Sequence, residues 1–119
     1  MTGGGALLYN ICMTQQTKQQ LDIIVHEIVT KYQPEKIILF GSAVRGEQTP
    51  DSDIDLLIIK KTTDRPADRL YRVWHSLTDW DVPVDFSVYT PEEFRRAQQE
   101  RSLFITDILH EGKTLYETS

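Results

Sequence analysis

Two short runs of apolar and β-branched residues stand out in the pattern of hydrophobic and polar positions. They cover residues 37–40 and 54–59, and Gly, Pro and Asp residues flank them. Runs of this length without polar alternation are typical of strands that are buried on both faces of a sheet. We therefore predict that both strands lie in the centre of a sheet.

Helical periodicity precedes and follows these runs. From Gln15 to Tyr32 the apolar residues recur every three or four positions, which predicts one amphipathic helix that Pro34 ends. Apolar residues recur with the same spacing over residues 70–80, and Pro66 suits the first helical position before them. The pattern thus predicts a second helix that carries the chain back for another strand.

Residues 82–89 alternate apolar and polar positions and predict a third strand. Thr90 to Glu93 form a capping-box pattern, which predicts that a helix starts there. Another helix is expected between Ser102 and Gly112, followed by a last strand or a pinned tail over residues 113–116. We predict an α/β (α+β) domain in which helices pack on a mixed sheet of three to four strands.

Composition limits the possible classes of protein. The 119 residues are expected to form a single domain over residues 14–119, after a disordered leader over residues 1–13 that contains three consecutive glycines. The net charge of -5 argues against an extended nucleic-acid surface. There is no apolar run of the length that a membrane span needs, and the single cysteine cannot form an internal disulfide. We expect a cytoplasmic protein.

Three acids carry the candidate chemistry. Asp53 and Asp55 open the second strand and, because side chains alternate along a strand, they point to the same side. Two carboxylates that close are stable when a cation sits between them, and Mg2+ prefers carboxylate oxygens. Asp85 lies on the polar face of the third strand. If that strand neighbours the second, all three acids share one site.

A glycine and a serine follow the first strand. Gly41 would allow the backbone to approach a ligand closely, and Ser42 suits the N-cap of a short helix through Arg45. The N–H groups at the start of such a helix would suit a phosphate. Arg45 either contacts phosphate or forms a surface ion pair with Glu47 or Asp51. Three arginines at positions 95, 96 and 101 form either a solvated helix face or a contact for a partner or a phosphate.

These residues resemble a known signature. Gly41-Ser42, ten intervening residues and then Asp53-Ile54-Asp55 are similar to the GS and DxD motif of the DNA polymerase β-type nucleotidyltransferase superfamily. That superfamily has a third acid on a later strand, which identifies Asp85 as the candidate. The small size and the closing segment EGKTLYE resemble the minimal nucleotidyltransferases, or MNT proteins.

The resemblance implies a fold, a reaction and a partner. It implies the nucleotidyltransferase fold and an Mg2+-dependent transfer of a nucleoside monophosphate from ATP, or from another nucleoside triphosphate, to a hydroxyl group. Two Mg2+ ions would be held by Asp53, Asp55 and Asp85, while Gly41 and Ser42 would hold the β- and γ-phosphates. Many MNT proteins are antitoxins of HEPN-domain toxins, and some transfer AMP to the toxin. The implied partner is a HEPN-domain toxin in a hetero-oligomer.

Two other functions are compatible with the same residues. The protein could be a non-catalytic binding module that masks its partner. It could also be a nucleotidyltransferase for small molecules such as drugs, although those relatives use an added domain for the acceptor.

Overall fold

The computed structural model describes residues 14–45, 53–78 and 80–118. The segment expected to be a leader therefore lies outside the described residues. None of the described helices is long and apolar enough to cross a membrane. The described elements are, in chain order, α2 (Gln15–Tyr32), β1 (Lys36–Phe40), α3 (Ser42–Arg45), β2 (Ile54–Ile59), α4 (Pro66–Ser76), β3 (Val84–Tyr89), α5 (Pro91–Gln99), α6 (Leu103–Glu111) and β4 (Lys113–Glu117).

The four strands form one mixed sheet in the order β3-β2-β1-β4. β1 is antiparallel to both β2 and β4, whereas β2 and β3 run parallel. A parallel pair needs a crossover between its strands, and α4 provides it. The predictions of a mixed sheet and of two central strands are confirmed, and the segment from Lys113 is a strand.

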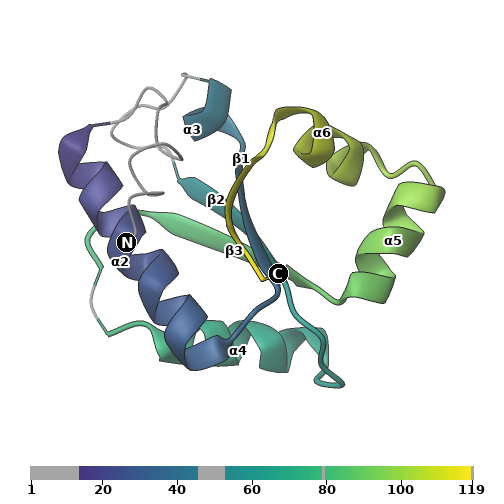
Figure 1. The fold of residues 1–119 in the computed structure, drawn as a ribbon, viewed down its shortest axis with the longest axis horizontal. Coiled ribbons are helices and arrows are strands. Elements are labelled where there is room, and N and C mark those ends of the chain that lie inside the picture. The colour runs from purple at the N-terminus through teal and green to yellow at the C-terminus, as the bar shows by residue number, and fades with distance from the viewer. Residues whose placement is uncertain (1–13, 46–52, 79, 119) are drawn as a thin grey trace.

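Helices cover both faces of the sheet (Figure 1), with α2 and α4 on one side and α5 and α6 on the other. The α2 stripe of Leu21, Ile24, Ile28 and Tyr32 is buried, as its spacing predicts. Alternate residues of β2 serve the two cores: Leu56 packs towards α2 and α4, and Leu57 packs towards Ile105 of α6. This two-sided burial is the reason that the strand sequence lacks polar alternation.

The helix expected over residues 70–80 ends earlier, at Ser76. Beyond it, the backbone N–H and the hydroxyl of Thr78 both donate to the Glu27 carboxylate of α2. The Glu27 carboxylate thus accepts the hydrogen bond of the Thr78 N–H, which therefore needs no carbonyl partner within a longer helix. Trp80 lies beyond the end of the helix, is 36% exposed, and packs on Trp74 with ring centroids 5.3 Å apart.

One arginine joins the two layers of helices around the edge strand β3. Arg69 of α4 forms a two-pronged ion pair with Glu93 of α5, at 2.7 and 3.1 Å, and its side chain is only 8% exposed. Its Nε donates to the Asp64 carbonyl at 2.9 Å, and its Nη1 to the Val88 carbonyl of β3 at 3.4 Å. Glu93 also completes the capping box with Thr90, so the predicted start of α5 is confirmed.

Candidate active site

The parallel pairing of β2 and β3 brings two of the three acids side by side. Asp55 and Asp85 are direct partners in the register of the two strands. Both belong to the face that α5 and α6 cover, because Leu57 and Tyr89 on the same alternation pack there. Asp53 immediately precedes β2, two residues before Asp55. The expectation that the third strand neighbours the second is confirmed.

The charges of these acids affect one another. The pKa of Asp55 is raised above its ordinary value, chiefly by burial and then by the negative charges of Asp85 and Asp53. The positive charge of Arg45 lowers the same pKa. The three carboxylates and one guanidinium therefore share one electrostatic environment.

The turn after β1 lies against this acid group. Gly41 has a φ of +83°, and a β-carbon on it would overlap the Asp55 carboxylate. The N–H groups of Val44 and Arg45 donate to the Gly41 carbonyl at 3.1 and 3.3 Å. α3 begins at Ser42 itself, so Ser42 is its first residue and does not precede it as the expected N-cap.

Arg45 makes an ion pair that its sequence neighbourhood does not reveal. Its Nη1 lies 3.2 Å from Oε1 of Glu111, the last residue of α6, and both side chains are 43% exposed. The partners expected from the sequence, Glu47 and Asp51, lie outside the described residues. Glu111 is 66 residues further along the chain. It is the first residue of the closing segment EGKTLYE, but nothing in that segment indicates that it pairs with Arg45.

A hollow of about 200 Å³ opens beside the turn, between the end of β1 and α6. Phe40 and Phe104 form its aromatic wall, with ring centroids 5.5 Å apart and planes at 87°. Phe40 is also the antiparallel partner of Asp55, so the hollow adjoins the acids. Its other lining residues are Gly41, Arg45, Asp107, Ile108 and Glu111.

The acids suit a divalent cation chemically. Three carboxylates at one end of two strands offer the hard oxygen ligands that Mg2+ prefers. A cation would offset the burial and the neighbouring negative charges that raise the pKa of Asp55. Within the described residues, no three acidic, His or Cys side chains are already drawn together as metal ligands. Asp53 and Asp85 are exposed, so the donor set is present at the surface without being closed around a common point.

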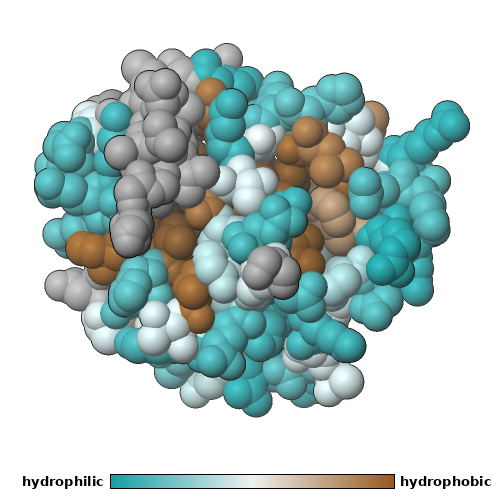
Figure 2. Space-filling view, in the orientation of Figure 1, coloured by the Kyte–Doolittle hydropathy of each residue, from teal (hydrophilic) through white to brown (hydrophobic). Residues whose placement is uncertain are grey.

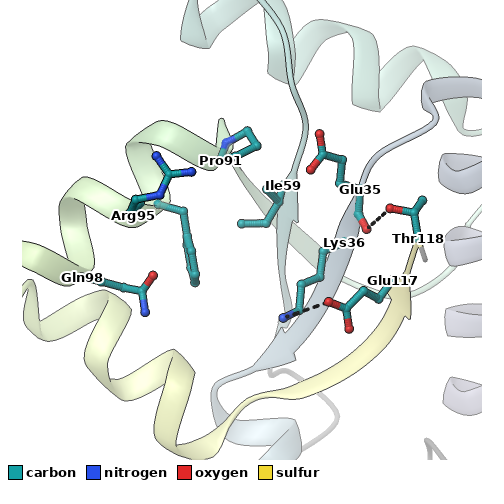
Figure 3. Close-up of a pocket in the computed structure, with 9 residues that line it drawn as sticks. Glu35, Lys36, Ile59, Pro91, Arg95, Gln98, Glu117 and Thr118 are labelled. Atoms are coloured by element: carbon teal, nitrogen blue, oxygen red, sulfur yellow. Dashed lines mark hydrogen bonds and ion pairs between the residues drawn. The ribbon is translucent and has the colours of Figure 1, made fainter.

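A larger hollow of about 310 Å³ lies at the other end of β1 (Figure 3). Arg95 and Gln98 of α5 line one side of it, and the ion pair of Lys36 with Glu117, at 3.8 Å, lines the other. Lys36 pairs with Ile59, at the opposite end of β2 from Asp55. Arg95 therefore lies away from the acids, and this hollow, which mixes both charge signs, is not continuous with them.

The chain is similar to several known proteins. Residues 21–113 match the family model described as "Nucleotidyltransferase domain". In Methanocaldococcus jannaschii, the protein named "Putative protein adenylyltransferase MJ0604" is 34% identical over 95 residues, which are 77% of this chain and 90% of that protein. A "Bifunctional uridylyltransferase/uridylyl-removing enzyme" of Streptomyces coelicolor is 34% identical over 62 residues. That match spans 50% of this chain but only 7% of the enzyme.

Solved structures share the fold. A crystal structure named as a putative nucleotidyltransferase from Sulfolobus solfataricus superposes with a TM-score of 0.59 at 24% identity, over 83% of this chain and 78% of that one. A toxin-antitoxin crystal structure with AMP-PNP gives a TM-score of 0.56 at 22% identity, over 82% and 73% of the two chains. A mutant of the toxin-antitoxin pair MntA-HpeT gives 0.54 at 22% identity, over 90% and 76%.

Proposed function

Because the chain belongs to the nucleotidyltransferase domain family, we propose that it transfers a nucleoside monophosphate, AMP from ATP, to a hydroxyl group of a partner protein. The observation that carries this proposal is the register that sets Asp55 beside Asp85, next to the Gly41 turn. A turn that can approach phosphates and a group of acids that can bind a cation are the two parts that phosphoryl transfer needs.

In the proposed reaction, the acceptor hydroxyl attacks the α-phosphorus of ATP. The new bond joins the acceptor oxygen to this phosphorus, the bond to the β-phosphate oxygen breaks, and pyrophosphate leaves. Asp85 accepts the proton of the hydroxyl, since it is exposed at the edge strand where an acceptor can approach. Gly41 and Ser42 hold the β- and γ-phosphates, and Arg45 contributes positive charge on the same side.

Asp53, Asp55 and Asp85 would hold Mg2+ in this reaction, as two ions in the general scheme of such enzymes. When bound, Mg2+ neutralises charge on the phosphates and on the oxygens that enter and leave. The residues themselves set the position of these charges, because the register of β2 and β3 fixes Asp55 and Asp85 relative to each other.

We further propose that the acceptor is a HEPN-domain toxin and that the modification neutralises it. The fold shared with toxin-antitoxin structures supports a protein acceptor. So does the surface of α6, which exposes Leu103, Phe104 and Leu109 beside the candidate site and forms a brown patch in Figure 2. Exposed apolar patches of this kind are typical of protein interfaces.

The test uses ATP labelled on the α-phosphate, MgCl2 and the protein encoded by the adjacent reading frame. Transfer of AMP predicts label on the partner, whereas ATP labelled on the γ-phosphate should leave it unlabelled. Asp53→Asn and Asp55→Asn should both abolish the label. Asp68→Asn, on the exposed side of α4, is the matched control and should leave it unchanged.

Neutralisation of the partner separates catalysis from masking. If Asp53→Asn and Asp55→Asn still neutralise it as well as the original protein does, then binding alone is sufficient and the transfer is not the mechanism. Label on a small-molecule acceptor, with none on the protein, would instead indicate a small-molecule nucleotidyltransferase.

A further inference from the structure

The ion pair between Arg45 and Glu111 connects the phosphate turn to α6. We propose that Glu111 is a positioning residue, which holds the Arg45 guanidinium beside the phosphates of the bound nucleotide. This inference rests on the proposed function, because it assigns a task to a residue outside the motif at the same site.

The backbone at Glu111 is held in place by α6 and by the pairing of β4 with β1. Glu111 is the last residue of α6, and the next residue but one, Lys113, already pairs with Leu39 of β1. The Gly112 N–H donates to the Ile108 carbonyl at 2.7 Å, which closes the end of the helix. The Glu111 carboxylate therefore projects from a segment that is tied directly to the strand leading into Gly41.

The backbone at Arg45 is held less firmly, because Arg45 lies on the short helix α3. α3 is only four residues long, so it contributes little rigidity of its own. The side chains of Arg45 and Glu111 line the same hollow as Gly41, and their charged atoms are 3.2 Å apart. The contact with α6 thus limits where the guanidinium can lie.

The guanidinium also lies near the acids, because Phe40, which lines the same hollow as Arg45, is the direct strand partner of Asp55. A guanidinium has five N–H donors in a fixed fork, so a bond from Nη1 to one carboxylate is compatible with bonds from other edges to a phosphate. Glu111 can therefore orient Arg45 without taking the place of the nucleotide.

The alternative role for Glu111 is competition, in which its negative charge takes the place of phosphate at Arg45. The two roles predict opposite changes in nucleotide affinity. Positioning predicts that loss of the side chain weakens binding, whereas competition predicts that it tightens binding.

The experiment measures the Kd of ATP with MgCl2 for the full chain and for Glu111→Ala, Glu111→Gln and Arg45→Ala. Glu111→Ala should weaken binding by about five- to tenfold, below the 10–100-fold that supporting residues of metal ligands give, because the pair is partly exposed. Glu111→Gln keeps an oxygen acceptor, so its Kd should lie between those of the original protein and Glu111→Ala. Glu100→Ala, at an exposed glutamate just after α5 and outside this hollow, is the matched control and should bind as the original protein does.

A double variant tests whether Glu111 acts through Arg45. In the Arg45→Ala background, Glu111→Ala should cause no further loss of affinity, whereas a merely structural role for Glu111 would weaken binding equally in both backgrounds. Equal losses, unchanged affinity or tighter binding on loss of Glu111 would overturn the proposal. The two failures are distinguishable. If the original protein binds ATP with MgCl2 but Glu111→Ala binds it equally well or more tightly, only this inference fails. If the original protein binds no ATP, the proposed function fails too.

Discussion

The Gly41 backbone lies against the Asp55 carboxylate, so closely that a β-carbon at position 41 would overlap Oδ2 of Asp55. Gly41 also adopts a φ of +83°, which side chains other than glycine rarely adopt. Two separate constraints therefore require glycine at this position. The turn after β1 and the acid on β2 are therefore in direct contact.

Gly41→Ala should destabilise the protein and reduce nucleotide transfer. The left-handed backbone alone costs about 1–2 kcal/mol for a residue with a β-carbon, and the overlap must also displace the Asp55 carboxylate. Urea unfolding measures the first effect, and the transfer assay measures the second.

Asp55→Ala provides the control for this contact. Without the carboxylate, the overlap at position 41 is relieved but the backbone cost remains. Gly41→Ala should then cost less free energy in the Asp55→Ala background than in the original protein. Equal costs in the two backgrounds would show that the contact does not matter.

Asp55→Asn should have opposite effects in the absence and presence of ligand. The raised pKa of Asp55 means that the folded protein holds this proton more tightly than the unfolded chain does. Stability from this group is therefore present at low pH and is lost as pH rises from about the ordinary value of 3.8 through the folded pKa. At pH 7 without metal, the asparagine removes the unfavourable charge and should raise the thermal midpoint.

With ATP and MgCl2 the same variant should lose the stabilisation that ligand binding gives. The original protein should show a higher thermal midpoint under these conditions, because a ligand that binds only the folded state stabilises it. Asp68→Asn serves as the control in both measurements. A lower midpoint for Asp55→Asn without metal would contradict the pKa argument, and an undiminished shift with ATP and MgCl2 would contradict the assignment of Asp55 to the site.

Arg69→Ala should be among the more destabilising changes of a charged residue. It removes the cation of a nearly buried pair and leaves the Glu93 carboxylate and the Val88 carbonyl without this donor. We expect a loss of about 2–3 kcal/mol, below the range for fully buried pairs because Glu93 is 40% exposed. Arg72→Ala, on the same helix, breaks an ion pair with Asp64 in which Arg72 is 63% exposed, and it should cost less than about 1 kcal/mol. Similar losses of unfolding free energy for Arg69→Ala and Arg72→Ala in urea would contradict the greater importance of the Arg69 pair.

The Glu93 carboxylate should give stability a dependence on acid pH. The hydrogen bond from Arg69 is the main cause that holds the pKa of Glu93 below its ordinary value of 4.5. Its contribution is therefore present above about pH 4.5 and is lost as pH falls through the lower folded pKa. Urea midpoints measured between neutral pH and acid should fall less steeply for Glu93→Gln than for the original protein. Parallel profiles would mean that Glu93 is not the responsible group.

The sequence predicts this fold well where local patterns are sufficient. The α2 stripe, the two buried strands and the Thr90 cap all depend on residues close together in the chain, and each is found as expected. The alternation along residues 82–89 also assigns Asp85 to the correct face. The sequence pattern cannot predict which strand pairs with β3, because that pairing depends on the path of the crossover through α4.

Contacts between distant residues explain the differences from expectation. α4 ends at Ser76 because Glu27 of another helix satisfies Thr78, and apolar spacing carries no sign of such a contact. The ion pair of Arg45 with Glu111 is equally hidden, since exposed charges follow no periodic pattern. Sequence reasoning therefore recovers the parts of the candidate site that a motif or a strand encodes, and it misses those that packing brings together.

The register of β2 and β3 determines both the position of Asp85 in the candidate site and the burial of Phe86 in the core. Asp85 belongs to the site and the next residue, Phe86, is 5% exposed in the core, so the two point to opposite faces. A slip by one residue would send Phe86 into solvent and drive Asp85 under the helices α2 and α4. A chain with a misaligned site would thus also have a broken core. Misassembled molecules would be eliminated by instability, so that a folded but misaligned form of this protein should not persist.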